Sequence, residues 1–152
     1  MDNQLYFEDF KIGDVFESQP REMEEAHFMK FAEITGDDHP LHYDLEYCKA
    51  HGWPERLAHG LLTTAHTVLG ASALAPRVHE SMIAFLEQST RFLKGVFIGD
   101  VLYPRLTVAE LTPKGEKGLL KLRSTIHNQK EEPVLEGYHL YLVRSRKGNQ
   151  TG

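Results

Sequence analysis

The sequence predicts an α+β fold in which one long buried helix packs against an antiparallel sheet. Residues 60–75 are apolar, small or Thr almost throughout and contain no charged residue, as expected of a helix that is buried on all sides. After this segment, apolar and polar residues alternate over four long stretches, which is the pattern of half-buried strands. Because the helical segments come first and most of the strands follow, the order favours a helix layer packed on a sheet.

Length and composition indicate a single domain and exclude several classes of protein. The 152 residues contain no repeat or linker, so one domain is expected over 1–152, with a frayed tail over 144–152. A net charge of −5 argues against binding to nucleic acid. No apolar run approaches the roughly 20 residues of a membrane span, and the first residues do not resemble a signal peptide. Cys48 is the single cysteine, so a cytoplasmic location is expected.

Short elements are expected before the long helix. Apolar residues at nearly helical spacing precede Gly36, a residue that commonly ends a helix. Asp44 is placed to cap the next helix through its carboxylate. The expected elements are an extended arm and a turn over 6–14, a strand over 15–19, a helix over 24–35, a loop over 36–44 and a helix over 44–50.

The long helix should begin at Gly60 and end before Pro76, because proline cannot continue a helix. A meander of strands is then expected, since the alternating stretches are separated by segments rich in Gly, Pro and Asn. A single sheet packed on one helix leaves an edge strand and an open face, which a second copy of the chain would cover. The expected strands span residues 81–93, 101–111, 118–127 and 134–143.

The loop over 36–44 contains the first candidate site. Asp37 and His42 are five residues apart in a segment that Pro40 bends and stiffens, so their side chains can converge. A carboxylate beside an imidazole raises the basicity of the ring, and such a pair can activate a water molecule near neutral pH. The alternative is a polar connecting loop without catalytic function.

The second candidate is the turn Ala58-His59-Gly60, which directly precedes the long helix. Backbone N–H groups at the start of a helix can bind a carbonyl oxygen that becomes negative, and glycine permits a close approach. The alternative is that His59 only caps the helix and Gly60 only allows tight packing. Taken together, the two candidates supply what the addition of water to a double bond conjugated with a carbonyl requires.

Four segments resemble a known family, and together they span most of the chain. They are Tyr6 to Asp14, Gly36-Asp37-Asp38-His39-Pro40-Leu41-His42-Tyr43-Asp44, Ala58-His59-Gly60-Leu61-Leu62, and Phe92 to Asp100. They are similar to the MaoC-like, (R)-specific enoyl-CoA hydratases, whose pattern runs approximately Gly-Asp-x-Asn-Pro-Leu-His-x-Asp and then Ala-His-Gly-Met. The resemblance implies a hot-dog fold, in which an antiparallel sheet wraps around a long central helix.

The resemblance also implies a reaction and its residues. Asp37 and His42 match the catalytic pair, and the Gly60 amide matches the donor to the thioester oxygen. The implied reaction is the reversible syn hydration of a trans-2-enoyl thioester, carried by CoA or a carrier protein, to the (R)-3-hydroxyacyl thioester. No metal or redox cofactor is expected. The expected assembly is a homodimer or a higher homo-oligomer.

One position departs from the family pattern, because His39 stands where the family usually has Asn. We expect activity to survive this change, since an imidazole can still donate one hydrogen bond. His39 and His59 are placed with Gly60 among the predicted oxyanion or substrate-binding residues. Related enzymes often have a hydroxyl on the central helix that faces the thioester. The candidates here are Thr63, Thr64 and Thr67, of which at least two are expected only to bond back to the helix.

Three other interpretations remain open. His39 and His42, with Asp37 or Asp44, could bind zinc, although the sequence has no recognised metal-binding spacing. A thioesterase of the same fold usually has a carboxylate on or near the central helix, and residues 60–75 have none. A non-catalytic module that binds acyl thioesters is compatible with the change at His39.

Overall fold

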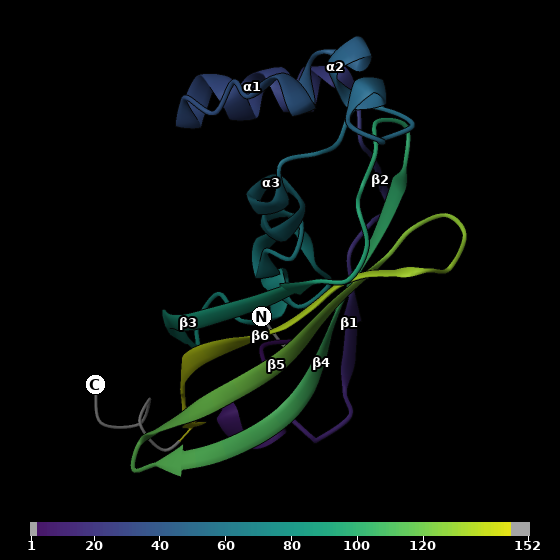
Figure 1. Ribbon diagram of the computed structural model, residues 1–152. Helices are drawn as coiled ribbons and strands as arrows, with labels where there is room; N and C mark the ends of the chain where they lie inside the picture. Colours follow the sequence, from purple (N-terminus) through teal and green to yellow (C-terminus); the bar gives the residue numbers. More distant parts are fainter. Residues whose placement is uncertain (1–2, 147–152) are drawn as a thin grey trace.

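The computed structural model describes residues 3–146, which form one curved antiparallel sheet with helices on one side (Figure 1). None of the helices in this range is long and apolar enough to cross a membrane. The strands are β1 (Val15–Glu17), β2 (Arg21–Glu22), β3 (Met82–Phe92), β4 (Val101–Lys114), β5 (Lys117–His127) and β6 (Pro133–Arg144). The helices are α1 (Glu25–Thr35), α2 (Leu45–Ala50) and α3 (Gly60–Ala65), with short 3-10 turns at Phe7–Asp9, Pro40–His42, Leu69–Ala71 and Ala75–Arg77.

The strand order is β1-β4-β5-β6-β3, and the short β2 also pairs with β4. The four long strands and the first two helices are confirmed, whereas β2 was not predicted. The predicted meander holds for β4, β5 and β6 only. The strand β3 instead pairs with β6 at the far edge, so the chain crosses the sheet between β3 and β4. In Figure 1, α3 lies beside the sheet near β3, while α1 and α2 lie at the top of the view, with α2 close to the upper end of the strands.

Alternate residues of β4, β5 and β6 form much of the core, whereas β3 has no buried residue. In β4 the buried positions include Leu102, Leu106 and Val108, and β5 and β6 alternate in the same way. This two-residue period places every second side chain on the face that the helices cover. A second cluster, which includes Phe28 of α1 and Leu62 of α3, joins the helices to the upper ends of the strands. The second cluster fixes the segments on which the candidate site lies.

The predicted helix over residues 60–75 is wrong in its extent, because α3 ends at Ala65. Val68 has an extended backbone, and two 3-10 turns follow. The N–H of Ala73 donates to Glu17 O at 2.9 Å, and Ser72 forms an isolated bridge with Ser18. The end of β1 thus supplies hydrogen bonds that a continuing helix would have to break. An apolar run alone does not reveal such a competing partner.

The prediction of a frayed tail from residue 144 is also wrong for its first residues. Arg144 belongs to β6, and Ser145 is buried. Ser145 Oγ donates to the Glu8 carboxylate, and the Arg146 guanidinium is 2.5 Å from Asp9 Oδ2. The N-terminal arm therefore holds this end of the chain through charge; its backbone is extended at Tyr6 and Phe10, with a 3-10 turn at Phe7–Asp9 between them. The rest of the predicted tail, 147–152, lies outside the described residues.

Candidate active site

The loop between α1 and α2 is held at both ends by local caps. Gly36 has φ 79°, a left-handed conformation that favours glycine, and its N–H donates to Ala32 O at the end of α1. At the other end, the Asp44 carboxylate accepts from the Tyr47 N–H, as expected of an N-cap. Pro40 begins the 3-10 turn between them. The loop therefore presents residues 37–42 in one defined conformation.

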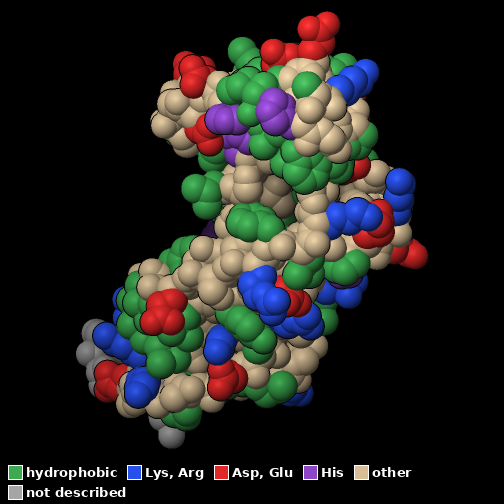
Figure 2. Space-filling view, in the orientation of Figure 1, with side chains coloured by type: hydrophobic (Ala, Val, Ile, Leu, Met, Phe, Trp, Pro, Cys, Tyr) green, Lys and Arg blue, Asp and Glu red, His purple; other side chains and the backbone are tan. Residues whose placement is uncertain are grey.

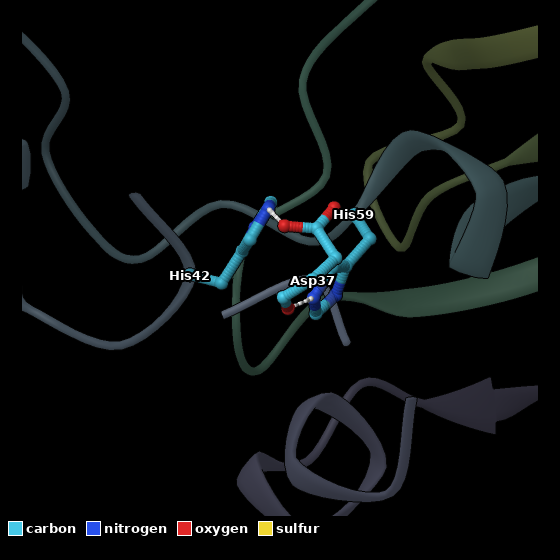
Figure 3. Close-up of side chains that lie close together, drawn as sticks. All are labelled: Asp37, His42 and His59. Atoms are coloured by element: carbon cyan, nitrogen blue, oxygen red, sulfur yellow. Dashed lines mark hydrogen bonds and ion pairs between the residues drawn. The ribbon is translucent and has the colours of Figure 1, made fainter. Parts of the chain in front are cut away.

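Asp37 and His42 face each other across this loop (Figure 3). His42 Nε2 lies 3.8 Å from Asp37 Oδ1, and the His42 side chain is almost buried while the carboxylate is half exposed. His42 Nδ1 is 2.7 Å from Leu57 O. Because a carbonyl oxygen only accepts, His42 must carry its proton on Nδ1 when neutral. The lone pair of Nε2 then faces the carboxylate, in a position to accept a proton.

His59 lies against this pair. It occupies the N-cap position of α3, but its side chain makes no hydrogen bond to the first turn of the helix, so the alternative that the side chain only caps the helix is wrong. The ring is 2% exposed and stacks on the His42 ring, with centroids 3.7 Å apart and planes inclined by 21°. Burial lowers the pKa of His59, although its hydrogen bond to the Asp37 backbone raises it in part. The imidazole of His59 is therefore neutral near pH 7.

Gly60 follows as the first residue of α3, and an open cavity of about 300 Å³ lies beside it. The amide of Gly60 has no acceptor within the helix, because the first N–H groups of any helix lack one. The walls of the cavity are mainly apolar and include Leu57, Ala58, Thr63, Phe92 and Val96. A larger hollow of about 910 Å³ lies between the end of β1 and the turn at 127–131, and none of the predicted site residues lines it.

His39 supports the loop in a way that differs from the expectation. Its ring is exposed, and Nδ1 accepts from the Leu41 N–H at 3.1 Å instead of donating. The backbone N–H of His39 donates to Asp37 Oδ1 at 3.4 Å. An Asn side-chain oxygen at this position could accept from the Leu41 N–H in the same manner. His39 does not line the cavity beside Gly60.

The three threonine hydroxyls all bond back to backbone carbonyls. Thr63 Oγ1 donates to His59 O at 3.4 Å, and Thr64 Oγ1 donates to Gly60 O at 3.2 Å. Thr67 Oγ1 donates to Thr64 O at 2.7 Å. Only Thr63 lines the cavity beside Gly60. Its bond is also the longest of the three, so Thr63 is the threonine most able to turn toward a ligand.

The donor atoms of Asp37, His42 and His59 lie within 4.8 Å of one another, which makes this the candidate metal site among the described residues. The zinc alternative had instead combined His39 and His42 with a carboxylate. A metal ion must lie near the plane of each imidazole that binds it, at about 2.1 Å. The stacked rings of His42 and His59 are too nearly parallel for their planes to meet at such a point. This arrangement therefore fits a metal ion poorly.

Two partners of the site were not found from the sequence. Tyr43 OH lies within 3.1 Å of His59 Nε2 and of Phe28 O, and burial together with Asp37 and Asp38 raises its pKa. Leu57 O selects the tautomer of His42. Tyr43 is adjacent to His42 in the sequence, so its proximity was available as a signal. A backbone carbonyl fifteen residues away gives no such signal.

Histidines gather in the upper part of the molecule, among apolar side chains and close to acidic ones (Figure 2). This is the part that holds α1, α2 and the candidate site in Figure 1. The grouping agrees with two ring contacts of His42, one with the His39 ring and one with the His59 ring.

Comparison with known proteins shows the family to which the chain belongs. A family model described as "MaoC like domain" matches residues 9–129. The chain is 31% identical to a 3-hydroxybutyryl-CoA dehydratase of Methylorubrum extorquens over 94% of this chain and 87% of the relative. It is 29% identical to an (R)-specific enoyl-CoA hydratase of Rhodospirillum rubrum, over 93% of each chain.

Solved structures resemble the whole chain. A protein from Archaeoglobus, described as a monoamine oxidase regulatory protein, has a TM-score of 0.87 at 32% identity and covers 94% of this chain and 96% of its own. A Mycobacterium tuberculosis protein described as having a double hot-dog fold has a TM-score of 0.76 at 29% identity. That match covers 94% of this chain and 45% of the other, as expected where one domain aligns with half of a doubled one.

Proposed function

Since the chain belongs to the MaoC-like domain family and has a hot-dog fold, we propose that it is a hydro-lyase acting on acyl thioesters. The reaction is the reversible syn hydration of a trans-2-enoyl thioester, on CoA or a carrier protein, to the (R)-3-hydroxyacyl thioester. Relatives named as a dehydratase and as a hydratase support both directions of this reaction. The observation that supports it most is the Nε2 lone pair of His42 facing the Asp37 carboxylate at 3.8 Å.

In this proposal one water molecule binds between the two side chains. It donates one hydrogen to His42 Nε2 and the other to the Asp37 carboxylate, so its oxygen is directed at C3 of the substrate. The oxygen–C3 bond forms as Nε2 takes up the first proton, and the protonated His42 then delivers this proton to C2 on the same face, which restores the neutral ring; the second hydrogen stays on the new hydroxyl group. A neutral His42 is the required starting state, which its bond to Leu57 O favours.

The Gly60 amide is the proposed donor to the thioester oxygen. Negative charge develops on this oxygen when water adds at C3, and an N–H aimed at it lowers the barrier. The apolar walls of the adjacent cavity suit an acyl chain. The CoA or pantetheine arm belongs to the substrate, so no separate cofactor or metal enters the proposal. A cytoplasmic location stays a prediction from the single cysteine.

A homodimer is the proposed assembly. The strand β3 is at one edge of the sheet, and large apolar side chains remain exposed along it, including Phe85 and Leu86. Leu61 on α3 and Phe92 at the end of β3 are exposed beside the site as well. A second copy that adds its own β3 would pair this edge and cover these side chains.

Crotonyl-CoA provides the test of the reaction. We expect the wild-type protein to remove the absorbance of the conjugated enone without release of free thiol, and chiral analysis should identify the (R)-3-hydroxy product. Asp37→Asn, which keeps the size of the side chain, should lower kcat by about 10²-fold or more because the neutral amide lacks the negative charge that orients the water and stabilises a protonated His42. Asp38→Asn is the matched control in the same exposed loop and should change kcat by less than about threefold.

Other outcomes separate the remaining alternatives. Release of thiol would identify a thioesterase. Binding of several acyl-CoAs with neither signal would identify a non-catalytic module. Equal activity of Asp37→Asn and Asp38→Asn would remove Asp37 from the mechanism.

A further inference from the structure

The buried imidazole of His59 has contacts that the proposed reaction does not use. It lies beneath His42 rather than in the cavity beside Gly60, whose walls do not include it. Its exposed fraction is 2%, so substrate does not reach the ring. The contacts of His59 are therefore with the proposed base His42 and its surroundings, and not with the substrate.

The ring of His59 is itself fixed from the other side. Phe31 of α1 lies with its ring centroid 4.7 Å away, and Phe28 meets it edge-on at 6.0 Å. The imidazole is thus packed between α1 and the His42 ring. Because aromatic stacking depends on orientation, this packing restricts rotation of the His42 ring as well.

The hydrogen bonds of His59 hold the other member of the pair. Nε2 is 3.1 Å from Asp37 O, and since a carbonyl only accepts, Nε2 must donate the proton. Nε2 is also 3.1 Å from Tyr43 OH, which lies 3.2 Å from the same carbonyl. The His59 Nε2–H therefore holds the backbone of Asp37 at the point from which its carboxylate extends, while the single hydroxyl proton of Tyr43 is shared between the same carbonyl and Phe28 O, 3.1 Å away.

The remaining nitrogen, Nδ1, is buried and has no hydrogen-bond partner. With Nε2 donating, Nδ1 carries only a lone pair, and a second proton there would be a buried charge without an acceptor. Burial also lowers the pKa of this ring. The groups that face it are Asp37, His42 and Tyr43. A neutral His59 leaves His42 free to take up a proton, whereas a cation stacked on it would oppose that step.

We propose that His59 is a positioning residue for the dyad: stacking fixes the plane of the His42 ring, and the Nε2–H fixes the Asp37 backbone. This inference rests on the proposed function and assigns no contact with substrate to His59. Its consequence is a selective effect on kcat, since a displacement of a catalytic group by about 1 Å can cost 10²-fold in rate. Substrate affinity should change little, because the cavity beside Gly60 keeps its walls.

Two substitutions separate the two contacts. His59→Phe keeps a flat ring against His42 but removes the donor to Asp37, and His59→Gln keeps an amide donor but removes the stacked ring. With crotonyl-CoA, each should lower kcat by about 10- to 100-fold while KM changes by less than about threefold. His66→Gln is the control, because His66 is a partly buried histidine at the end of α3 outside the dyad, and it should retain wild-type kcat. Thermal unfolding of each variant shows whether it is folded.

A measurement that does not depend on activity completes the test. Side-chain ¹⁵N–¹H NMR of the wild-type protein should show His59 as the Nε2–H tautomer and His42 as the Nδ1–H tautomer. In His59→Gln, the unstacked His42 ring should rotate and weaken its Nδ1–H bond to Leu57 O, so the His42 signals should shift toward a mixture of tautomers. If the wild-type protein hydrates no acyl thioester, the proposed function fails, yet the NMR result still decides the positioning. Folded variants with wild-type kcat, a rise in KM with unchanged kcat, or an unchanged single tautomer of His42 would each overturn this inference.

Discussion

His42 and His59 stack on one another, yet they donate through opposite ring nitrogens. Leu57 O accepts from Nδ1 of His42, and Asp37 O accepts from Nε2 of His59. Two carbonyls thus decide which nitrogen of each ring is free. The free nitrogen of His42 faces the half-exposed carboxylate, and the free nitrogen of His59 is buried. Identical side chains therefore have different chemistry because their backbone partners differ.

The Gly60 amide gives the first prediction at this scale. Gly60→Pro removes the N–H at the first position of a helix, where proline is tolerated, and His59 already has the φ −56° and ψ 134° that suit a residue before proline. Gly60→Ala keeps the N–H and is the matched control, because both variants add a Cβ whose nearest neighbours are atoms of the Phe92 ring. We expect Gly60→Pro to lower kcat for crotonyl-CoA by about 10²- to 10³-fold relative to Gly60→Ala. Similar rates for the two folded variants would show that this amide does not bind the thioester oxygen.

The motif at residues 36–44 could be recognised at the residue scale because its signals are local. Gly36 and Asp44 act as the predicted caps, and the separation of Asp37 and His42 within one bent loop permits their approach. The contact between His59 and His42 could not be obtained in this way. It requires that the turn before α3 packs against α1, and seventeen residues separate the two histidines.

At the scale of the elements, α3 is joined to β6 by a chain of hydrogen bonds. Thr67 Oγ1 donates to Thr64 O, so it must accept from His139 Nε2, which is 3.0 Å away. His139 Nδ1 then accepts from Tyr141 OH at 3.1 Å. Burial lowers the pKa of His139 to about 4 and raises the pKa of Tyr141 to about 12. Both groups are therefore neutral at pH 7, and each donor in the chain has an acceptor.

The buried, neutral His139 of this hydrogen-bond network predicts how the stability of the protein depends on pH. His139 binds a proton in the unfolded state below about pH 6.5 but in the folded state only below about pH 4. The unfolded state therefore holds more protons between these values, and stability falls as pH falls through this window, by up to about 1.4 kcal/mol per pH unit for one group. Urea unfolding at a series of pH values from 4.5 to 7.5 measures this change in the free energy of unfolding. His139→Gln should have a shallower slope than the wild-type protein, and equal slopes would contradict the buried neutral state.

The elements differ in how far the sequence revealed them. All four long strands are present, but the two-residue period that predicted them appears as alternating burial only in β4, β5 and β6, whereas β3 at the sheet edge has no buried residue. The end of α3 does not follow from any pattern within residues 60–75, because it is set by hydrogen bonds with the end of β1. Apolar composition predicts burial of a segment, but here it gave the wrong length for the helix.

At the scale of the whole molecule, the position of β3 at the sheet edge decides what the chain leaves exposed. Phe85 is 51% exposed and Leu86 is 47% exposed, and no further strand pairs with the outer side of β3 within residues 3–146. An edge of this kind is open to pairing with a second chain. Leu61 is 69% exposed next to Gly60, so the same open face extends to the candidate site.

Leu86→Glu tests the proposed dimer. We expect the wild-type protein to have twice the mass of the 17.4 kDa chain in solution, and Leu86→Glu to shift the equilibrium toward the single chain, because a charge would be buried at the seam. Val15→Glu, an exposed position on the opposite edge strand, is the control and should leave the dimer intact. Sedimentation or light scattering gives the mass. A dimer that only Val15→Glu dissociates would place the interface at the other edge.

Sequence patterns alone were sufficient for the α+β class, the four long strands, the first two helices and the loop with Asp37 and His42. These depend on periodicity and caps, in which each residue interacts with near neighbours along the chain. Only the tertiary structure decided the end of α3, the edge position of β3, the stacking of His59 on His42 and the partners of His139. Each of these depends on a contact between residues far apart in the sequence, and such contacts form only when the separate elements pack together.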